Sequence, residues 1–174
     1  MKKKILIINT GGTISSVKSK QGFVPQAGFV KQSLSVMTEL EHCDMPDYEL
    51  LEFESLLDSS NISINDWNQI AIQIKQNYNK FNGFVILHGT DTMAYTASAL
   101  SFMLENLAKP VIITGAQIPL SEIRSDGKEN LITALFLAQS ENLNEVCIYF
   151  DQRLLRGNRA QKVSAYEFSA FDSP

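Results

Sequence analysis

The sequence has few cysteines, and its apolar runs are short. Cys43 and Cys147 are the two cysteines among 174 residues, and they match no C-x-x-C motif, so we expect reduced structural thiols and not a disulfide framework. The longest apolar runs, such as FVIL and PVIIT, have the length of a strand and cannot cross a bilayer. The start MKKKILIIN lacks a small-residue cleavage site, so it predicts a first strand and not a signal peptide. These absences predict a cytoplasmic protein with no membrane association.

An excess of positive charge is also missing. The formal net charge is −4 and the isoelectric point is about 5.2, which argues against non-specific binding of nucleic acid, because that binding needs a basic surface. No repeat, low-complexity stretch or Pro/Gly/Ser-rich linker interrupts the chain. With 44% hydrophobic and 20% charged residues, the composition is typical of a globular protein, and we expect residues 1–174 to form one domain.

Strand and helix patterns alternate along the chain. Short continuous apolar runs predict buried strands, and apolar residues three or four positions apart predict helices. The pattern predicts strands at 4–9, 48–54, 83–88, 109–115 and 145–150, helices at about 30–41, 63–80, 92–107 and 126–140, and a loop from 10 to about 28. Parallel strands joined by helices imply an α/β fold, doubly wound, with a mainly parallel sheet and flanking helices.

Small residues, hydroxyls and carboxylates follow each predicted strand. In doubly wound sheets ligands bind outside the carboxyl ends of the strands, so residues from five separate places are expected at one edge. They are Thr10 to Thr13, Asp58 to Ser60, His88 to Asp91, Thr114 to Gln117, and Asp151 with the polar tail that carries Arg156, Arg159 and Lys162.

The glycines after the first strand do not fit two common phosphate-binding motifs. A P-loop requires a lysine that is missing after Gly12, and a dinucleotide fingerprint requires three spaced glycines where only Gly11 and Gly12 occur. The two glycines could equally form a plain turn. Other residues also have ordinary structural interpretations. Asp91 or Thr92 could cap a helix, and His88 is more typical of a buried strand end than of a base.

The polar groups at this edge form an inventory for acyl transfer that needs no histidine. A hydroxyl nucleophile requires a base or cation beside it and donors for the oxyanion. Thr13 and Thr90 supply hydroxyls, Asp91 a carboxylate and Lys162 an amine, and the glycine turns supply backbone N–H groups. No metal is expected, since residues 42–44 (His, Cys, Asp) are adjacent and suit a loop better than a tetrahedral site.

Five motifs in this order resemble the bacterial L-asparaginases, most closely the cytoplasmic type I branch. They are NTGGTIS, DSS at 58–60, LHGTDTMAYTASAL, KPVIITGAQIPLSEIRSDGKENL and RLLRGNRAQKVSAYEFSAFDSP. The resemblance covers residues 5–174 and implies the N-terminal catalytic domain of that family. It implies hydrolysis of L-asparagine to L-aspartate and ammonia without metal or cofactor, by a homodimer or homotetramer.

The resemblance also implies roles for single residues. Thr13 matches the nucleophile of the family's TGGTI motif, and Thr90, Asp91 and Lys162 match its second hydroxyl, aspartate and lysine. A water ordered by Thr90 and polarised through Lys162 and Asp91 would then hydrolyse the acyl-enzyme.

The substrate-binding positions follow from the same motifs. Asp58 and Ser59 match the residues that hold the α-amino and α-carboxylate groups of the substrate, and Ser60 lies beside them. Ala116 matches a loop position whose backbone lies by the scissile amide.

Two departures from the family pattern lead to alternative hypotheses. Phe23 stands where the family has a tyrosine, and it lacks the phenol that accepts or relays a proton. The sequence ends at Pro174, where we expect the family's smaller C-terminal domain to be absent. The protein could therefore be a weakly active or inactive form, or a non-catalytic binder of aspartate or asparagine. A third hypothesis is the amidase subunit of a tRNA-dependent amidotransferase, although such subunits carry an extra preceding domain and the first strand here begins at Lys4.

Overall fold

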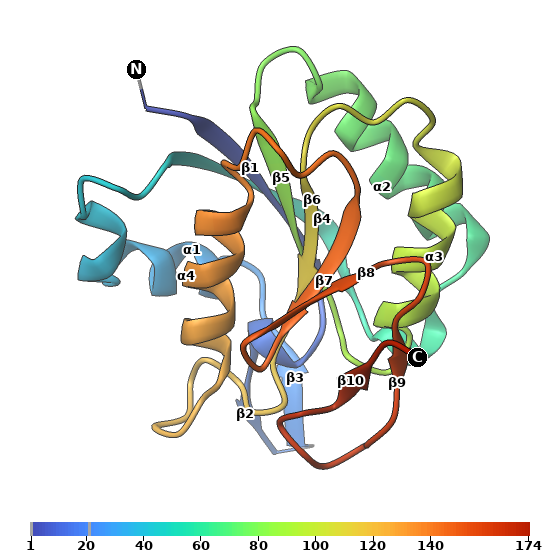
Figure 1. Cartoon of the computed structure of the whole chain (residues 1–174). Coiled ribbons are helices and arrows are strands. Elements are labelled where there is room, and N and C mark those ends of the chain that lie inside the picture. Colours follow the sequence, from blue (N-terminus) through green and yellow to red (C-terminus); the bar gives the residue numbers. More distant parts are fainter. Residues whose placement is uncertain (1, 21) are drawn as a thin grey trace.

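A computed structural model describes residues 2–20 and 22–174. Its centre is a six-stranded sheet with the order β4-β1-β5-β6-β7-β8 (Figure 1). The strands are β1 (Lys4–Gly11), β4 (Asp47–Leu57), β5 (Gly83–Leu87), β6 (Val111–Thr114), β7 (Val146–Phe150) and β8 (Arg153–Arg156). The first five pair in parallel, and β8 is antiparallel to β7. The predicted α/β fold with a mainly parallel sheet is confirmed.

Helices cover both faces of the sheet (Figure 1). α1 (Phe29–Ser35) and α4 (Gly127–Leu137) pack on one face, and α2 (Ile64–Asn77) and α3 (Met93–Met103) on the other. The side chains of β1 alternate between the two cores, Ile5 and Ile7 on the α1/α4 side and Leu6 and Ile8 on the α2/α3 side. This explains why β1 reads as a continuous apolar run. Among the described residues, no helix is both long and apolar enough to span a membrane.

All four helices end before their predicted last residue, and two of them differ most from the prediction. The predicted helix 30–41 is α1 followed by a separate 3₁₀ helix, Thr38–Glu41, because the chain turns at Val36 and thereby buries Met37. The predicted helix 92–107 ends at Met103, and Asn106 takes a positive φ of 55°. The apolar residues that extended the pattern, Leu104 and Leu107, pack against the core from the turn that follows. Apolar spacing therefore persisted beyond the end of the helix.

The predicted loop 10–28 and the polar tail contain short strands. β2 (Ser16–Ser19) and β3 (Gly22–Pro25) form an antiparallel hairpin, and β9 (Gln161–Lys162) pairs with β10 (Phe171–Asp172). All four lie at the end of the sheet where β1 and β5 finish (Figure 1). They have two to four residues each, and of their residues only Ser16 and Phe171 are buried, so they are too short to show the alternating or continuous apolar pattern that identifies a strand.

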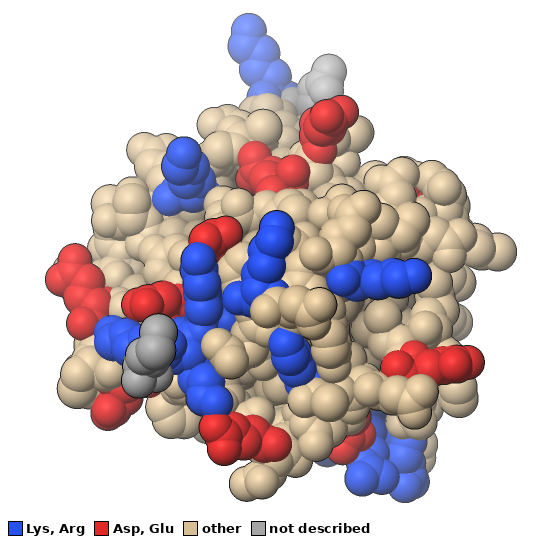
Figure 2. Space-filling model, turned by 90° about the horizontal axis from the view of Figure 1, so that it is seen from above, with Lys and Arg blue, Asp and Glu red and all other residues tan. Residues whose placement is uncertain are grey.

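The opposite end of the sheet, where β1 begins, carries charges of both signs. Seen from above, acidic side chains are interspersed among lysines and arginines (Figure 2). Ion pairs join Lys3 to Glu141 and Lys4 to Glu49. Both pairs are largely exposed and contribute little to stability. Over the described residues, the charged side chains at this end therefore do not form a surface of a single sign.

Candidate active site

A cavity of about 330 Å³ lies at the carboxyl ends of the parallel strands. Strand ends, the β2–β3 hairpin and the segment around β9 all contribute to it. Its lining residues are Gly12, Thr13, Ser16, Phe23, Pro25, Asp58, Ser59, Gly89, Thr90, Asp91, Gln117, Lys162 and Ala165. A larger groove, of about 830 Å³, lies between α2 and the turn after α3 and contains none of the predicted site residues.

The turn after β1 requires its two glycines. Gly11 and Gly12 have φ values of +124° and +82°, a region that favours glycine. A Cβ on Gly12 would lie 2.3 Å from the backbone N of Gly89, and one on Gly11 would lie 2.4 Å from the carbonyl O of Leu57. The end of β1 thus passes directly between the ends of β4 and β5. This contact brings Thr13, the first residue of a 3₁₀ helix (Thr13–Ser15), to the cavity.

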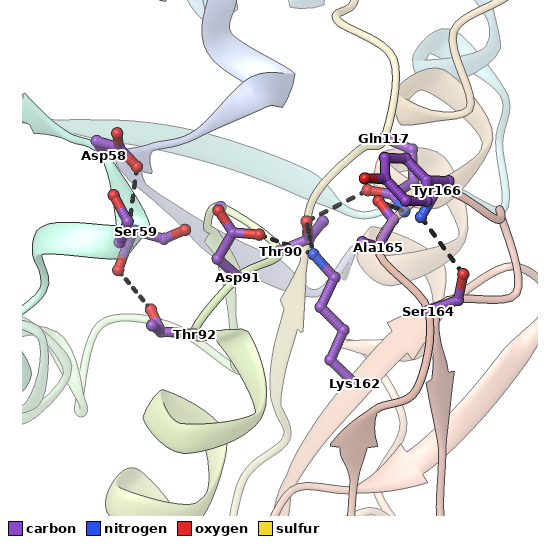
Figure 3. Close-up of polar contacts among 12 residues, drawn as sticks. Asp58, Ser59, Thr90, Asp91, Thr92, Gln117, Lys162, Ser164, Ala165 and Tyr166 are labelled. Atoms are coloured by element: carbon purple, nitrogen blue, oxygen red, sulfur yellow. Dashed lines mark hydrogen bonds and ion pairs between the residues drawn. The ribbon is translucent and has the colours of Figure 1, made fainter.

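Lys162 joins two other predicted residues although they are more than 70 positions away in sequence. Its Nζ donates to Thr90 Oγ1 at 2.9 Å and to Asp91 Oδ1 at 2.8 Å (Figure 3). The Lys162 side chain is 17% exposed, whereas that of Asp91 is 62% exposed. The structure therefore brings the predicted hydroxyl, carboxylate and amine into direct contact. Thr13 lines the same cavity.

The turn after β4 is fixed to the start of α3. Asp58 Oδ1 accepts a hydrogen bond from the backbone N of Ser60 at 3.0 Å, and Thr92 Oγ1 donates to the carbonyl O of Ser59 at 2.7 Å (Figure 3). Thr92 holds the N-cap position of α3 but makes no capping hydrogen bond. Its hydroxyl instead ties Ser59 to the strand end that carries Thr90.

Two predicted site residues lie beside the cavity and not in its lining. Ser60 is exposed and reaches Asp58 through its backbone N. Ala116 is 1% exposed and packs in the core on the α1/α4 side. The implied role of Ala116 belongs to its backbone, so it stays a prediction.

His88 is a buried and fully hydrogen-bonded histidine. Its Nδ1 lies 2.6 Å from the carbonyl O of Gly89, and its Nε2 lies 2.9 Å from Thr96 Oγ1, which also accepts from Trp67 Nε1. Nδ1 therefore carries the proton and donates to Gly89, and Thr96 donates to Nε2. Burial lowers the pKa of His88 to about 4. This agrees with its interpretation as a satisfied strand-end histidine, since it does not line the cavity.

Phe23 lies on β3 at the edge of the cavity. Its side chain is 48% exposed and lines the cavity together with Pro25. Glu52 on β4 connects the end of this hairpin to the glycine turn, because its carboxylate accepts from Gly28 N at 2.7 Å and from Asn9 Nδ2 at 2.8 Å. Asn9 Oδ1 in turn accepts from Gly11 N at 3.1 Å. One side chain thus links the base of the hairpin to β1.

Gln117 is a cavity residue that the sequence did not single out. It was one of several residues expected after β6, next to Ala116, and no motif assigned it a role. Its Oε1 accepts from Thr90 Oγ1 at 3.2 Å, and its Nε2 donates to the carbonyl oxygens of Ala165 at 3.3 Å and Glu167 at 2.9 Å (Figure 3). The one signal in the sequence for Gln117 was its place after a strand end. Its carbonyl partners could not be anticipated, because they lie in a segment without recognisable secondary structure.

One group of possible metal ligands exists within residues 2–20 and 22–174. His42, Cys43 and Asp44 bring ligand atoms within 4.8 Å of one another on an exposed segment. None of the three lines the cavity. The carboxylates of the cavity are already paired with Lys162 or with a backbone N–H, and the hydroxyls of Ser16 and Thr90 already donate hydrogen bonds. The cavity thus presents two carboxylates, a lysine and several hydroxyls, and the expected absence of a metal there stays a prediction.

Comparisons with known proteins agree on one family. Residues 4–174 match the family described as Asparaginase, N-terminal. The chain is 54% identical to L-asparaginase 1 of Escherichia coli (strain K12), covering 99% of this chain and 51% of that protein. It resembles the crystal structure of L-asparaginase I from Vibrio cholerae with a TM-score of 0.91 and 52% identity, covering 100% of this chain and 52% of that one.

A more distant relative carries a different name. A glutamyl-tRNA(Gln) amidotransferase subunit of Saccharolobus solfataricus is 35% identical, over 99% of this chain and 40% of its own length. The chain spans about half the length of the two L-asparaginases. Because the family match covers residues 4–174, the chain belongs to the asparaginase family, in the part described as its N-terminal domain.

Proposed function

We propose that the protein hydrolyses the side-chain amide of L-asparagine to L-aspartate and ammonia, with Thr13 as the nucleophile. The observation that carries this proposal is the convergence of remote segments: Lys162 Nζ contacts both Thr90 Oγ1 and Asp91 Oδ1 in a cavity that Thr13 also lines. The L-asparaginase names of relatives more than 50% identical to the chain support the same reaction.

Substrate binding begins at the turn after β4. The Asp58 carboxylate binds the α-ammonium group, and the Ser59 hydroxyl binds the α-carboxylate. Both residues line the cavity beside Gly89, where a Cβ would lie 2.4 Å from Ser59 Oγ. This close packing fixes the position of Ser59 relative to the strand end that carries Thr90. The side-chain amide of the substrate then extends toward Thr13.

In the first half of the reaction, Thr13 Oγ1 attacks the amide carbon. A C–O bond forms, the carbonyl oxygen becomes an oxyanion, and backbone N–H groups near Gly12 and Thr90 stabilise it. One well-placed donor of this kind contributes about 3 kcal/mol to transition-state stabilisation. The C–N bond then breaks, the proton of the Thr13 hydroxyl is transferred to the leaving nitrogen, and ammonia departs from a threonyl ester.

In the second half, water hydrolyses that ester. Thr90 orders the attacking water, and the Lys162–Asp91 pair polarises it through the Thr90 hydroxyl. The water oxygen bonds to the ester carbon, the bond between that carbon and Thr13 Oγ1 breaks, one proton of the water passes to Thr13 Oγ1, and L-aspartate leaves. The 2.9 Å and 2.8 Å contacts of Lys162 support this route, because they connect the three groups into one unit.

The test is release of ammonia from L-asparagine by the protein purified as its gene encodes it. We expect turnover that Thr13→Ala abolishes, while L-aspartate still binds by calorimetry through Asp58 and Ser59. Turnover that survives Thr13→Ala would refute the proposed mechanism. The matched control is Thr38→Ala, a threonine at the start of the 3₁₀ helix Thr38–Glu41, outside the cavity lining.

A second candidate is a non-catalytic binder of aspartate or asparagine. Phe23 favours it, since it brings to the cavity edge an aromatic ring without a hydroxyl. Calorimetric binding without any ammonia release would support this candidate, and Phe23→Tyr should then restore part of the rate. The amidase-subunit hypothesis has support in the name of a relative 35% identical, and copurification of a partner protein or tRNA would favour it.

We further propose that the protein acts in the cytoplasm as a homodimer or homotetramer. Its two cysteines support the compartment, since both are free thiols and Cys43 is exposed. Light scattering of the purified protein measures the assembly.

A further inference from the structure

We propose that Gln117 is a positioning residue: it accepts the hydrogen of the Thr90 hydroxyl and so leaves the lone pairs of Thr90 Oγ1 facing Lys162. This inference rests on the proposed function, because it assigns Gln117 to the same reaction. The geometric basis is that Thr90 is held from two sides, by Lys162 Nζ at 2.9 Å and by Gln117 Oε1 at 3.2 Å (Figure 3).

The carboxamide of Gln117 has no freedom to turn. Its oxygen accepts from Thr90, and its two N–H groups donate to the carbonyl oxygens of Ala165 and Glu167. A flipped amide would set its N–H groups against Thr90 and its oxygen against two carbonyl oxygens. Both carbonyls therefore enforce one orientation of the amide, with Oε1 facing Thr90.

The backbone of Gln117 is held as firmly. Its N–H donates to both oxygens of Asp126 at 3.1 and 3.0 Å, and the N–H of Ile118 donates to Asp126 Oδ1 at 2.9 Å. Asp126 is the N-cap residue of α4 and also accepts from Asn130 Nδ2 at 3.2 Å. A rigid helix end thus anchors the residue whose side chain reaches the cavity.

This arrangement leaves the Thr90 hydroxyl one direction. A hydroxyl has one hydrogen, and here Gln117 Oε1 accepts it. The lone pairs of Thr90 Oγ1 then face Lys162, which donates to them. The hydrogen bonds run in one sense, from Lys162 through Thr90 and Gln117 to the carbonyls of the segment that carries Lys162 itself.

The chain of hydrogen bonds closes a ring, because Lys162 and Ala165 belong to one segment. Residues 162–167, Thr90 and Gln117 therefore hold one another in place. The rate of a reaction in which a side chain orients a water falls steeply when that side chain is no longer held in place. A misplacement of about 1 Å can lower the rate about 10²-fold. Gln117 therefore acts on the chemical step through Thr90, and not on binding of the α-groups at Asp58 and Ser59.

The main test compares Gln117→Met with the parent protein. Methionine has a similar length but neither accepts strongly from Thr90 nor donates to the carbonyls. We expect kcat for ammonia release to fall about tenfold, with KM and the calorimetric affinity for L-aspartate changed less than twofold. A loss confined to KM or to L-aspartate affinity, with kcat unchanged, would overturn the inference. Gln139→Met is the matched control, since Gln139 Nε2 also donates to a carbonyl, that of Asp44, outside the cavity.

A double-mutant cycle separates positioning from a structural role. If Gln117 acts through the Thr90 hydroxyl, Gln117→Met should have no further effect on kcat in the Thr90→Val background. Equal effects of Gln117→Met in both backgrounds would refute the inference. If thermal unfolding shows that Gln117→Met is not folded, Gln117→Asn replaces it in the cycle, because it keeps the amide and shortens its reach by one methylene.

The outcomes also distinguish this inference from the proposed function. A parent protein without ammonia release, or with release unchanged by Thr13→Ala, refutes both. Release that depends on Thr13 but is unchanged by Gln117→Met refutes only the role of Gln117.

Discussion

Two regions of the molecule differ in how they are held in place. The first, here called the strand-end region, consists of residues 11–13, 58–59 and 89–91. The second, here called the covering segments, consists of residues 16–20, 22–25 and 161–172. In the strand-end region, glycines let backbones touch, and a Cβ on Gly12 would lie 2.3 Å from Gly89 N. In the covering segments, a Cβ on Gly22 would meet no atom within 4 Å. The strand-end region is held by close backbone packing, whereas in the covering segments the carbonyl oxygens of Ala165 and Glu167 are held by one side chain, that of Gln117, and Glu52 holds Gly28 just after the hairpin. The proposed reacting groups and the walls around them are thus stabilised in different ways.

The largest effect is expected when the proposed nucleophile of the strand-end region is removed. Thr13→Ala should lower kcat by at least about 10³-fold, because no other group in the proposed mechanism forms the ester. Steady-state ammonia release measures the loss. Thr13→Ser, which keeps a hydroxyl, should retain more activity than Thr13→Ala, and equal losses would contradict a nucleophilic role.

The next prediction contrasts the two regions through matched glycines. Gly12→Ala should lower the free energy of unfolding by about 3 kcal/mol, since it adds both a positive-φ penalty and a backbone clash. Gly22→Ala, at φ +105° in open space, should cost about 1 kcal/mol for the conformation alone. Urea unfolding measures both. Equal losses would show that packing does not distinguish the regions.

Acid should weaken the strand-end region through His88. Its pKa is about 4 in the folded protein against an ordinary value of 6.5, so between these two values the unfolded chain binds more protons than the folded one. Stability therefore falls as pH decreases through that window, by about 2 kcal/mol between pH 7 and pH 5 from this residue. Urea unfolding at the two pH values should show that dependence reduced in His88→Gln and kept in His42→Asn. An unchanged dependence in His88→Gln would contradict the assignment.

A smaller effect is expected in the covering segments at Phe23. Phe23→Tyr adds a phenol at the cavity edge and should raise kcat about tenfold, less than the roughly 10²- to 10⁴-fold that a fully positioned proton-transfer group contributes. Phe168→Tyr is the control, because Phe168 is 41% exposed, close to the 48% of Phe23, but does not line the cavity. No gain in Phe23→Tyr would show that the hairpin contributes shape and not chemistry.

The smallest effect is expected at the link between the two regions. Glu52→Gln weakens the acceptors for Gly28 N and Asn9 Nδ2 and should cost about 1 kcal/mol. Hydrogen exchange in the hairpin residues 16–20 and 22–25 should quicken more than exchange in β5. Glu54→Gln, an exposed position two residues along β4, should leave both rates unchanged.

The sequence predicted the sheet and the strand-end residues well for a physical reason. Buried parallel strands have continuous apolar runs, and the residues that follow them must gather at one edge, which is why Thr13, Thr90 and Asp91 could be placed together. The contact of Lys162 with that pair depended on the family resemblance, because β9 has two residues and no apolar pattern. Gln117 stayed unassigned, since its partners are backbone carbonyls of residues 165 and 167, and carbonyls leave no mark in a sequence. The β2–β3 hairpin was missed because its strands are short and exposed.

Gly12 precedes Thr13 and Gly89 precedes Thr90, so the contact between the two glycines sets the spacing between the Cα atoms of these threonines. With no side chain between the backbones, this spacing depends on main-chain dimensions alone and not on the choice of any rotamer. Substitutions on the outside of the molecule should therefore change the distance between the Cα atoms of Thr13 and Thr90 little, whereas the direction of each hydroxyl depends on its own side-chain partners, such as Gln117 and Lys162 at Thr90. A protein built in this way can vary the walls of its cavity, as at Phe23, while the Cα atoms of Thr13 and Thr90 keep their separation.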